Sequence, residues 1–506
     1  MSLIDKQKYF IALDLGTTST RVNIIDKDFE VLSGTRFEST LIQNDDGFAE
    51  LDPKPYFDNI VRILREAVTQ STIDASEIIS LGISCQRSTF ITWDRETGEP
   101  FHNLITWKDR RAIATVDKVN NSFLLKLINN SSKFMYAITR SDFFKVTSKL
   151  KMANTWLNHR LQFLLKNNRQ LQRAVEENRA LYGGLDTWLL SKLKKVHSGV
   201  DHVSDISYSA ATGIFDVFKL EFSTPMLAYF GINRKILPKI VSNFHDFGYT
   251  HESILGVPVK IDVMISDQSA SLIANRCFNA WSSKITLGTG SFFHVNVGDK
   301  CIGSDTTANP LVAWWFPKRS NKPTFKLEFF HESSSESIKF METVGLISDV
   351  RDLSDMASSV DNADGVFFIP EFFGFIGIKQ STNRLHLIRA VLENIIFNIC
   401  SYIFSTLNEP KYRPNKIRID GGISQNDFVC QQIATLSGID IERAKNCSEL
   451  TSVGCAILCA YKCGMLKTLE ESENFYESEK IFTPVASASA NLQKDYQRFL
   501  KVVKKL

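Results

Sequence analysis

The sequence contains no apolar run long enough to cross a membrane, and Met1 to Lys6 do not open like a signal peptide. Both absences argue against a membrane-spanning or secreted protein. An excess of charge of one sign is also missing, because 59 Lys and Arg face 56 Asp and Glu, for a formal net charge of +3. This balance gives no reason to expect nucleic acid or an anionic membrane as the main partner.

Cysteine is scarce, with nine residues, an odd number, scattered along the chain. Such usage does not suggest a disulfide framework and fits a reducing compartment, so we expect a cytoplasmic protein. Cys455, Cys459 and Cys463 recur at helical spacing. A metal cluster is conceivable there, but the spacing is unlike the usual paired ligands. We expect these thiols to behave as small buried apolar side chains.

The chain does have enough hydrophobic residues, 43% of 506, for two or three domains with substantial cores. Its most informative stretch follows an apolar run, Tyr9–Leu13, and precedes another, Val22–Asp26. A short polar turn between two strands predicts a β-hairpin. Gly16 allows close approach of a ligand to the backbone, and successive N–H groups in such a turn form an anion-binding nest. The alternative is a hairpin with a polar turn and no ligand.

The residues of this turn suit a metal–phosphate ligand. Asp14 stands at the strand end, where a metal ion would be needed, and three hydroxyls follow it: Thr17, Thr18 and Ser19. The same layout returns at Lys284–Phe293, where Gly288 and Thr289 occupy the turn; Thr17 and Thr289 are 272 residues apart. This repeat predicts two similar halves, 1–275 and 276–506, that each present a phosphate-binding hairpin to a shared cleft.

Two further strands end in polar residues. Ile78–Ser84 is a compact apolar run typical of a buried parallel strand, and Arg87 and Ser88 follow it. Asp267 and Gln268 lie where a second predicted strand, ending at Ser266, runs into a helix. Ligands collect at the carboxyl ends of such strands. Asp267 is therefore a candidate cleft carboxylate, although an Asp at this junction could also serve only as a helix cap.

A fourth motif begins with the strand Lys416–Asp420, which leads into a Gly-rich turn at Gly421 and Gly422 and then into a helix near Asn426. A strand, a Gly-rich turn and a helix N-terminus together suit an adenine nucleotide.

Taken together, these motifs resemble the FGGY family of sugar and polyol kinases, and the resemblance covers nearly the whole chain. It implies two actin-like (ribonuclease H-like) α/β ATPase domains with an interdomain cleft, and transfer of a phosphoryl group from ATP to a hydroxyl. It implies Asp267 as general base, Mg²⁺ held by Asp14 through water, and the sugar or polyol contacted by Arg87, Ser88, Trp107, Asp267 and Gln268. It further implies nucleotide binding by Thr17, Thr18, Ser19, Arg21, Gly288, Thr289, Ser335, Lys339, Gly422 and Asn426.

The sequence departs from the family pattern at several positions. Ser88 stands where glycerol kinases have Glu, which removes an acceptor for substrate hydroxyls. Ser335 and Lys339 replace a Gly and a Gln near the nucleotide phosphates, and Ala153 replaces a signature Lys. The segment 371–376 is shorter than in the family and lacks its Trp-Asp-Pro.

These departures leave two hypotheses. The first and favoured one is an ATP- and Mg²⁺-dependent kinase of glycerol or a related polyol or sugar, with a homodimer as the candidate assembly. The second is a catalytically impaired pseudokinase that keeps the fold and the nucleotide and acts as a regulatory or interaction protein.

Overall fold

The computed structural model describes residues 9–195, 201–305 and 308–505. Within it the chain forms two compact units, each assembled from separate segments of the sequence. Unit 1 comprises Met1–Ala274, Val297–Lys326 and Thr451–Phe475, and unit 2 comprises Asn275–Asn296, Leu327–Leu450 and Tyr476–Leu506.

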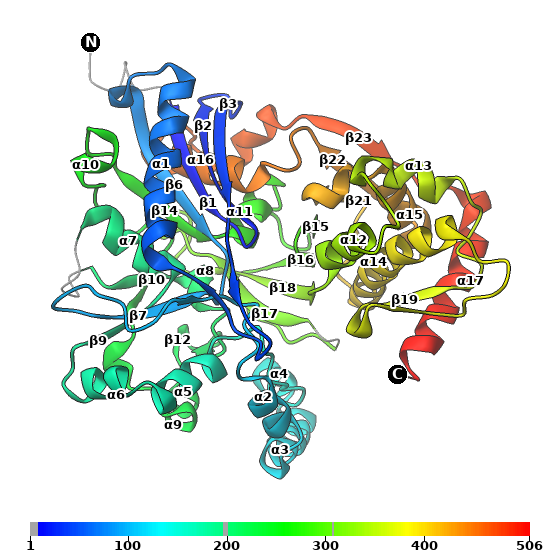
Figure 1. Cartoon of the computed structure of the whole chain (residues 1–506), viewed down its shortest axis with the longest axis horizontal. Helices are drawn as coiled ribbons and strands as arrows, with labels where there is room; N and C mark the ends of the chain where they lie inside the picture. Colours follow the sequence, from blue (N-terminus) through cyan, green and yellow to red (C-terminus); the bar gives the residue numbers. More distant parts are fainter. Residues whose placement is uncertain (1–8, 196–200, 306–307, 506) are drawn as a thin grey trace. The chain divides into compact units, whose positions relative to one another are not determined.

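Five strands form the large sheet of unit 1: β1 (Tyr9–Leu15), β2 (Ser19–Asp26), β3 (Val31–Glu38), β6 (Ile78–Cys85) and β14 (Ile261–Ser266). Their order is β14-β6-β1-β2-β3 (Figure 1). β1 and β2 form an antiparallel hairpin, and β3 pairs antiparallel with β2, whereas β6 pairs in parallel with both β1 and β14. The predicted first hairpin and the predicted buried parallel strand at Ile78–Ser84 are both confirmed.

The helices of unit 1 differ widely in length: α1 (Pro53–Ser71), α2 (Ile113–Asn120), α3 (Phe123–Thr139), α4 (Asp142–Thr147), α5 (Asn158–Asn167), α6 (Arg169–Glu176), α7 (Leu185–Lys194), α8 (Ile206–Ser209), α9 (Thr224–Phe230), α10 (Glu252–Leu255), α11 (Asp267–Ala274) and α16 (Leu450–Cys463). α1 shows why the pattern folds this way. Asp52 caps it by accepting from the Lys54 N–H at 3.0 Å, and Ile60, Ile63 and Leu64 recur at helical spacing to join the sheet's core.

Unit 1 also contains a smaller sheet in the order β4-β5-β8-β7-β9. Its strands are β4 (Ile42–Gln43), β5 (Ala49–Leu51), β8 (Leu104–Ile105), β7 (Phe90–Asp94) and β9 (Ala180–Gly184). The segment after β8 is fixed by an ion-pair cluster, in which the buried Arg111 guanidinium contacts Asp109 and Glu50. This cluster holds the chain next to Trp107 in place.

α16 packs closely against two elements of unit 1. A Cβ added to Gly82 of β6 would lie 3.0 Å from Cys455 Cβ and 3.0 Å from Cys459 Sγ. A Cβ added to Gly454 would lie only 2.0 Å from the Ala270 carbonyl oxygen of α11. Both glycines therefore allow close packing of backbone. Cys455 and Cys459 are buried as predicted, whereas Cys463, the last residue of the helix, is exposed.

The second large sheet has seven strands: β15 (Ser283–Leu287), β16 (Ser291–Gly298), β17 (Asn309–Trp314), β18 (Thr324–His331), β21 (Lys416–Asp420), β22 (Asp440–Ala444) and β23 (Ser478–Phe482). Their order is β17-β18-β16-β15-β21-β22-β23. The hairpin β15–β16 is antiparallel, and β21 pairs in parallel with β15 and β22. β16-β15-β21-β22 thus repeats the arrangement of β2-β1-β6-β14, as expected for a duplicated hairpin.

The helices of unit 2 are α12 (Ser334–Thr343), α13 (Leu353–Ser358), α14 (Arg384–Leu407), α15 (Asp427–Ser437) and α17 (Ala486–Val503). Among the described residues only α14 is long and apolar enough to cross a membrane by length and composition. The prediction that no apolar run reaches membrane-spanning length is therefore wrong for α14. However, 72% of its apolar window is buried inside the protein, and its Arg389 and Glu393 form a buried ion pair at 2.8 Å. α14 therefore has the burial of a core helix.

Candidate active site

The carboxyl ends of β1, β6 and β14 meet at one edge of the unit 1 sheet. Leu15 is in register with Cys85, and Cys85 is in register with Ser266. This alignment brings together the predicted residues that stand at or just beyond the three strand ends: Asp14, Arg87 and Asp267. The expectation that polar residues gather there is confirmed for these three positions.

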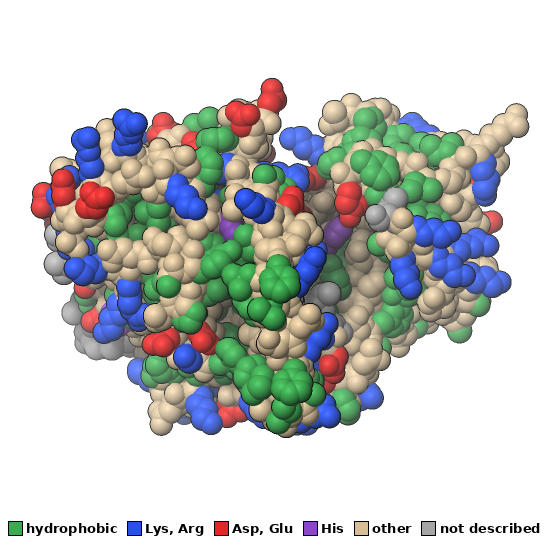
Figure 2. Space-filling view, turned by 90° about the horizontal axis from the view of Figure 1, so that it is seen from below, with side chains coloured by type: hydrophobic (Ala, Val, Ile, Leu, Met, Phe, Trp, Pro, Cys, Tyr) green, Lys and Arg blue, Asp and Glu red, His purple; other side chains and the backbone are tan. Residues whose placement is uncertain are grey.

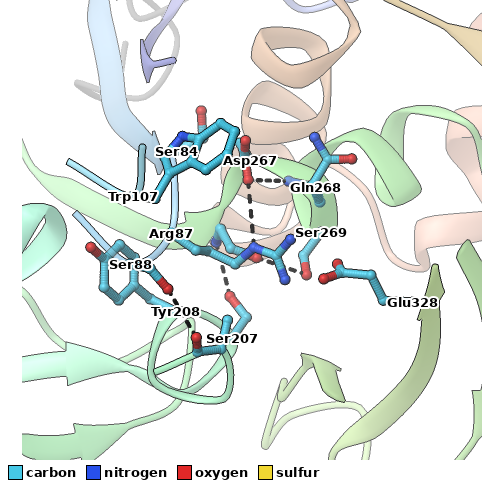
Figure 3. A network of polar contacts seen from close by, with 12 residues as sticks. Ser84, Arg87, Ser88, Trp107, Ser207, Tyr208, Asp267, Gln268, Ser269 and Glu328 are labelled. Atoms are coloured by element: carbon cyan, nitrogen blue, oxygen red, sulfur yellow. Dashed lines mark hydrogen bonds and ion pairs between the residues drawn. The ribbon is translucent and has the colours of Figure 1, made fainter. Parts of the chain in front are cut away.

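Asp267 is the first residue of α11, and its carboxylate is oriented by one hydrogen bond and one ion pair (Figure 3). Its Oδ1 accepts a hydrogen bond of 2.7 Å from the Gln268 N–H and lies 4.0 Å from Arg87 Nε. The Arg87 side chain is only 9% exposed, whereas that of Asp267 is 23% exposed. A capping side chain accepts from the N–H two or three residues further on, whereas this hydrogen bond joins adjacent residues and is not the capping geometry for Asp267. Its remaining exposure leaves the carboxylate accessible to a ligand.

A buried network fixes the backbone just before Asp267. Ser207, which is labelled in Figure 3, accepts at Oγ from the Ser266 N–H at 2.9 Å and donates from Oγ to Asp205 Oδ1 at 2.5 Å. Asp205 caps α8 by accepting from the N–H groups of Ser207 and Tyr208. Burial, together with the nearby Asp186 carboxylate, raises the pKa of Asp205 to about 8. This network could not be predicted from local sequence patterns, because 59 residues separate Ser207 from Ser266.

The first hairpin is also held by specific contacts. Asp14 Oδ1 accepts from Ser84 Oγ at 2.7 Å, and Thr17 Oγ1 accepts from Trp107 Nε1 at 2.7 Å. Arg21 Nε donates to Ser19 Oγ at 3.3 Å. A residue predicted to contact the polyol and one predicted to contact phosphate are therefore hydrogen-bonded to each other.

Thr18 is the most exposed residue in the turn of this hairpin, between the part-buried Thr17 and Ser19. The Thr18 side chain is exposed, while its carbonyl accepts from the Ser39 N–H at 2.8 Å. A Cβ added to Gly16 would lie 2.8 Å from the Ser19 carbonyl oxygen, so the turn could not close this tightly with a larger residue.

Ser88 lies beside Arg87 but is turned into the protein. Its side chain is buried, its hydroxyl donates to the Ala211 carbonyl at 2.9 Å, and its φ is +62°, in the left-handed region. The hydroxyl predicted to contact substrate is therefore bound to the main chain. Gln268 is also largely buried, next to Asp267.

In unit 2 the second hairpin is fastened to the start of α12. The Ser335 N–H and the Ser335 hydroxyl both donate to the Thr289 carbonyl, at 3.2 Å and 3.1 Å. The turn also closes on itself, because the Gly288 N–H donates to the Gly290 carbonyl at 3.1 Å. Lys339 is exposed one helical turn after Ser335. The side chain at the position of the family's Gly thus supports the turn of the second hairpin.

The predicted adenosine segment leads from β21 into α15. A Cβ added to Gly421 would lie 2.4 Å from the Leu287 carbonyl oxygen, and the φ of Gly421 is +93°, so this position requires glycine. A Cβ added to Gly422 would meet no atom within 4 Å, so its small size leaves open space. Asn426 caps α15 by accepting from the Val429 N–H at 3.1 Å.

A buried polar cluster that the sequence analysis missed supports the second hairpin. Asp420 accepts from Thr286 Oγ1 and Asn275 Nδ2, both at 2.5 Å, and lies 3.9 Å from the fully buried ammonium of Lys284. The sequence does contain a sign of this cluster, because each of two apolar strands carries a charged residue: Lys284 in β15 and Asp420 in β21. Only the parallel pairing of β15 with β21 brings these residues together.

The shortened segment folds as a closed hairpin. β19 (Phe367–Ile369) pairs antiparallel with β20 (Gly374–Ile376), and Phe373 takes a left-handed φ of +47° at the turn. Phe340 of α12 packs against Phe373 at 5.5 Å between ring centroids. The segment therefore packs against the helix that carries Ser335 and Lys339.

Comparison with known proteins decides the family. The N-terminal domain model of the FGGY family of carbohydrate kinases matches residues 9–274, and the C-terminal domain model matches residues 283–463. The chain belongs to the FGGY family. Membership makes it an ATP-dependent kinase of a sugar or polyol hydroxyl. The resemblance predicted from the sequence is thereby confirmed, and the pseudokinase alternative receives no specific support.

Relatives align over almost the full chain. Glycerol kinase 5 of Danio rerio is 34% identical over 497 residues, covering 96% of this chain and 93% of the relative. Glycerol kinase 5 of Homo sapiens is 31% identical over 490 residues, covering 94% and 91%. Plasmodium falciparum glycerol kinase, solved with ADP, has a TM-score of 0.83 at 23% identity and covers 99% of this chain and 98% of its own. The predicted fold class is confirmed.

Proposed function

We propose that this FGGY kinase transfers the γ-phosphoryl group of ATP to a hydroxyl of glycerol or a closely related polyol. Relatives with substantial identity along the chain are named glycerol kinases, which supports this choice of acceptor. The observation that carries the proposal is the Arg87–Asp267 pair at the strand ends of unit 1. The pair places a cation beside an accessible carboxylate. The substrate hydroxyl that receives the phosphoryl group must lose its proton, and the carboxylate can accept that proton.

Asp267 would act as the general base. As the acceptor oxygen bonds to the γ-phosphorus, its proton passes to Asp267, the bond to the β-phosphate oxygen breaks, and ADP leaves. Phosphoryl transfer depends mainly on positioning and charge stabilisation. Asp205 and Ser207 fix the backbone that carries Asp267.

On the acceptor side, the donors of Arg87, the indole of Trp107 and the amide of Gln268 would orient the polyol. Ser88 would shape the pocket only indirectly, because its hydroxyl is already bound to the Ala211 carbonyl. Without a carboxylate at position 88, the site has one acceptor fewer for hydroxyl groups, so weaker selectivity for glycerol is expected.

Nucleotide binding is assigned to both hairpins and to the adenosine segment. Phosphate groups would contact Thr17, Thr18, Ser19, Arg21, Gly288, Thr289, Ser335 and Lys339, and the nucleoside would contact Gly422 and Asn426. The open space beside Gly422 and the exposure of Thr18 and Lys339 support these roles.

Asp14 fits a Mg²⁺ ion held mainly through water. The described residues contain no group of three side chains that could by themselves hold a metal, so one carboxylate at a phosphate site is the arrangement available. Mg²⁺ keeps several waters and is commonly held by one or two carboxylates together with phosphates. When bound, the ion would neutralise charge on the phosphates, and Ser84 would orient Asp14.

We also propose a reducing, cytoplasmic location, which is supported by nine cysteines without a disulfide. A homodimer remains a proposal that measurement of the mass in solution will test.

The function is tested by ADP release with Mg²⁺ and ATP against a panel of polyols and sugars. Glycerol or a near relative is expected to stimulate release, and MgATP is expected to raise the unfolding temperature by mass action. Clear stabilisation by MgATP without transfer to any acceptor would favour the pseudokinase. No response to millimolar MgATP would exclude both functions.

A further inference from the structure

Helix α3 presents an apolar face to solvent. Phe123 is 80% exposed, Phe134 is 66% exposed and Ile138 is 63% exposed. Figure 2 looks onto the end of unit 1 that carries α2, α3 and α4, and shows hydrophobic side chains gathered there beside Lys and Arg. We define the α3 apolar face as Phe123, Leu124, Leu127, Ile128, Phe134 and Ile138, all exposed.

The helix is held by its opposite side. Leu125 and Ser132, seven residues apart, are the buried residues of α3, and Asn129 Nδ2 between them donates to the Leu150 carbonyl at 3.1 Å. Steps of three and four residues, as from Leu124 to Leu127 and from Phe134 to Ile138, keep the apolar face on one side. An ordinary surface helix buries its apolar stripe and exposes its polar side. In α3 the apolar stripe is exposed instead.

The charge of this helix also differs from that of the chain. Lys126, Lys133 and Arg140 recur every seven residues and therefore form a row along one side of the helix. No Asp or Glu occurs from 119 to 141, although acidic and basic residues nearly balance over the whole sequence. The stretch 119–141, which lies between Asp117 of α2 and Asp142 of α4, thus combines apolar side chains with basic residues only, and its complement is apolar and anionic.

We propose that α3 binds the surface of an anionic lipid bilayer, with its apolar face in the boundary between headgroups and acyl chains. Helices that lie in this boundary combine Leu and Phe on one side with Lys and Arg beside them. The row of Lys126, Lys133 and Arg140 would contact lipid phosphates. Phe143 of α4, which is also exposed, extends the apolar surface.

Charge and size favour a bilayer over a protein partner. A helix of 17 residues is about 25 Å long. The α3 apolar face runs along this one helix, which suits the shallow insertion of a helix that lies in a bilayer surface. A second copy would also bring its own basic row without an acidic one to pair with it. A bilayer provides apolar depth and negative charge along the whole helix.

The test uses the full chain in sedimentation with vesicles of phosphatidylcholine, alone or mixed with phosphatidylserine. Binding is expected with the anionic vesicles and should weaken as salt rises. The double variant Phe134→Ser, Ile138→Ser is expected to bind at least about tenfold more weakly. Lys126→Glu and Lys133→Glu should each weaken binding about fivefold or more. These side chains are exposed, so thermal unfolding should change little.

A matched pair of leucines provides the control. Leu127 on the α3 apolar face is 49% exposed, and Leu32 on β3 is 48% exposed. Leu127→Ser should weaken vesicle binding, whereas Leu32→Ser should leave it unchanged. The proposal is overturned if the wild type does not bind anionic vesicles, or if both leucine variants bind alike. It is also overturned if wild-type sedimentation reflects self-association, which light scattering without lipid would reveal. Kinase activity enters none of these measurements.

Discussion

The two hairpins have the same strand arrangement, but different hydrogen bonds hold their turns. In unit 1 the hairpin turn is hydrogen-bonded through Thr17 to Trp107, a residue assigned to the acceptor. In unit 2 the turn is hydrogen-bonded through the Thr289 carbonyl to Ser335, on a helix assigned to the nucleotide. With the roles proposed above, the printed contacts join the first hairpin to a residue of the acceptor site and the second hairpin to a residue of the nucleotide site.

The strongest test of this division is Asp267→Asn in unit 1. Asn keeps the size and one oxygen but cannot accept the substrate proton, so transfer should fall at least about a hundredfold. Stabilisation by MgATP should persist, because it depends on other residues. Transfer to the best acceptor and thermal shift are measured side by side. The matched control is Asp52→Asn at the cap of α1, which should leave transfer unchanged. Equal transfer by the Asp267 variant and the wild type would mean that Asp267 is not the general base.

Gly422→Ala tests the unit 2 side. The added Cβ meets no protein atom within 4 Å, so the unfolding temperature should stay the same. A bound nucleoside would meet it, and the KM for ATP should rise about tenfold, which corresponds to about 1.4 kcal/mol. The KM for the polyol should not change. If neither KM moves, Gly422 does not contact the nucleotide.

Two substitutions with smaller expected effects compare the hydrogen bonds at the two turns directly. Trp107→Phe removes the hydrogen bond to Thr17, and Ser335→Ala removes one of two bonds to the Thr289 carbonyl. One such bond is worth about 0.5–1.5 kcal/mol, so affected KM values should rise about two- to tenfold. Trp107→Phe should raise the KM of both substrates, and Ser335→Ala that of ATP alone. Indistinguishable kinetic profiles would remove the proposed asymmetry.

The smallest expected effect concerns the pH dependence of unit 1. The pKa of Asp205, raised to about 8, exceeds its ordinary value, so between about pH 4 and 8 the folded protein binds more protons than the unfolded chain. Asp205 therefore makes the free energy of unfolding fall as pH rises through this window. Above the window its contribution no longer changes with pH. Asp205→Asn should flatten that slope in thermal unfolding, with a change of a few degrees at most. A slope identical to that of the wild type would mean that Asp205 is ionised throughout.

Much of the fold could be predicted because its signals are local. The apolar runs at β1 and β6 and the cap at Asp52 are read within a few residues of sequence. The position of Asp267 followed from a strand meeting a helix. Contacts between distant segments could not be read this way. The direction of Ser88 depends on the Ala211 carbonyl, 123 residues away, and on a left-handed φ that its residue type does not demand.

The close packing of α16 has a consequence for how the protein is made. Gly82 of β6 and Ala270 of α11 are covered by residues 454–459, which leave the ribosome some 180 residues or more after α11 does. Until then, one side of the strand that leads to Arg87 and of the helix that begins at Asp267 lacks its cover. Unit 1 therefore completes its core only near the end of synthesis. Its early segments must meanwhile persist as partly folded chain with exposed apolar surface, the kind of species on which chaperones act.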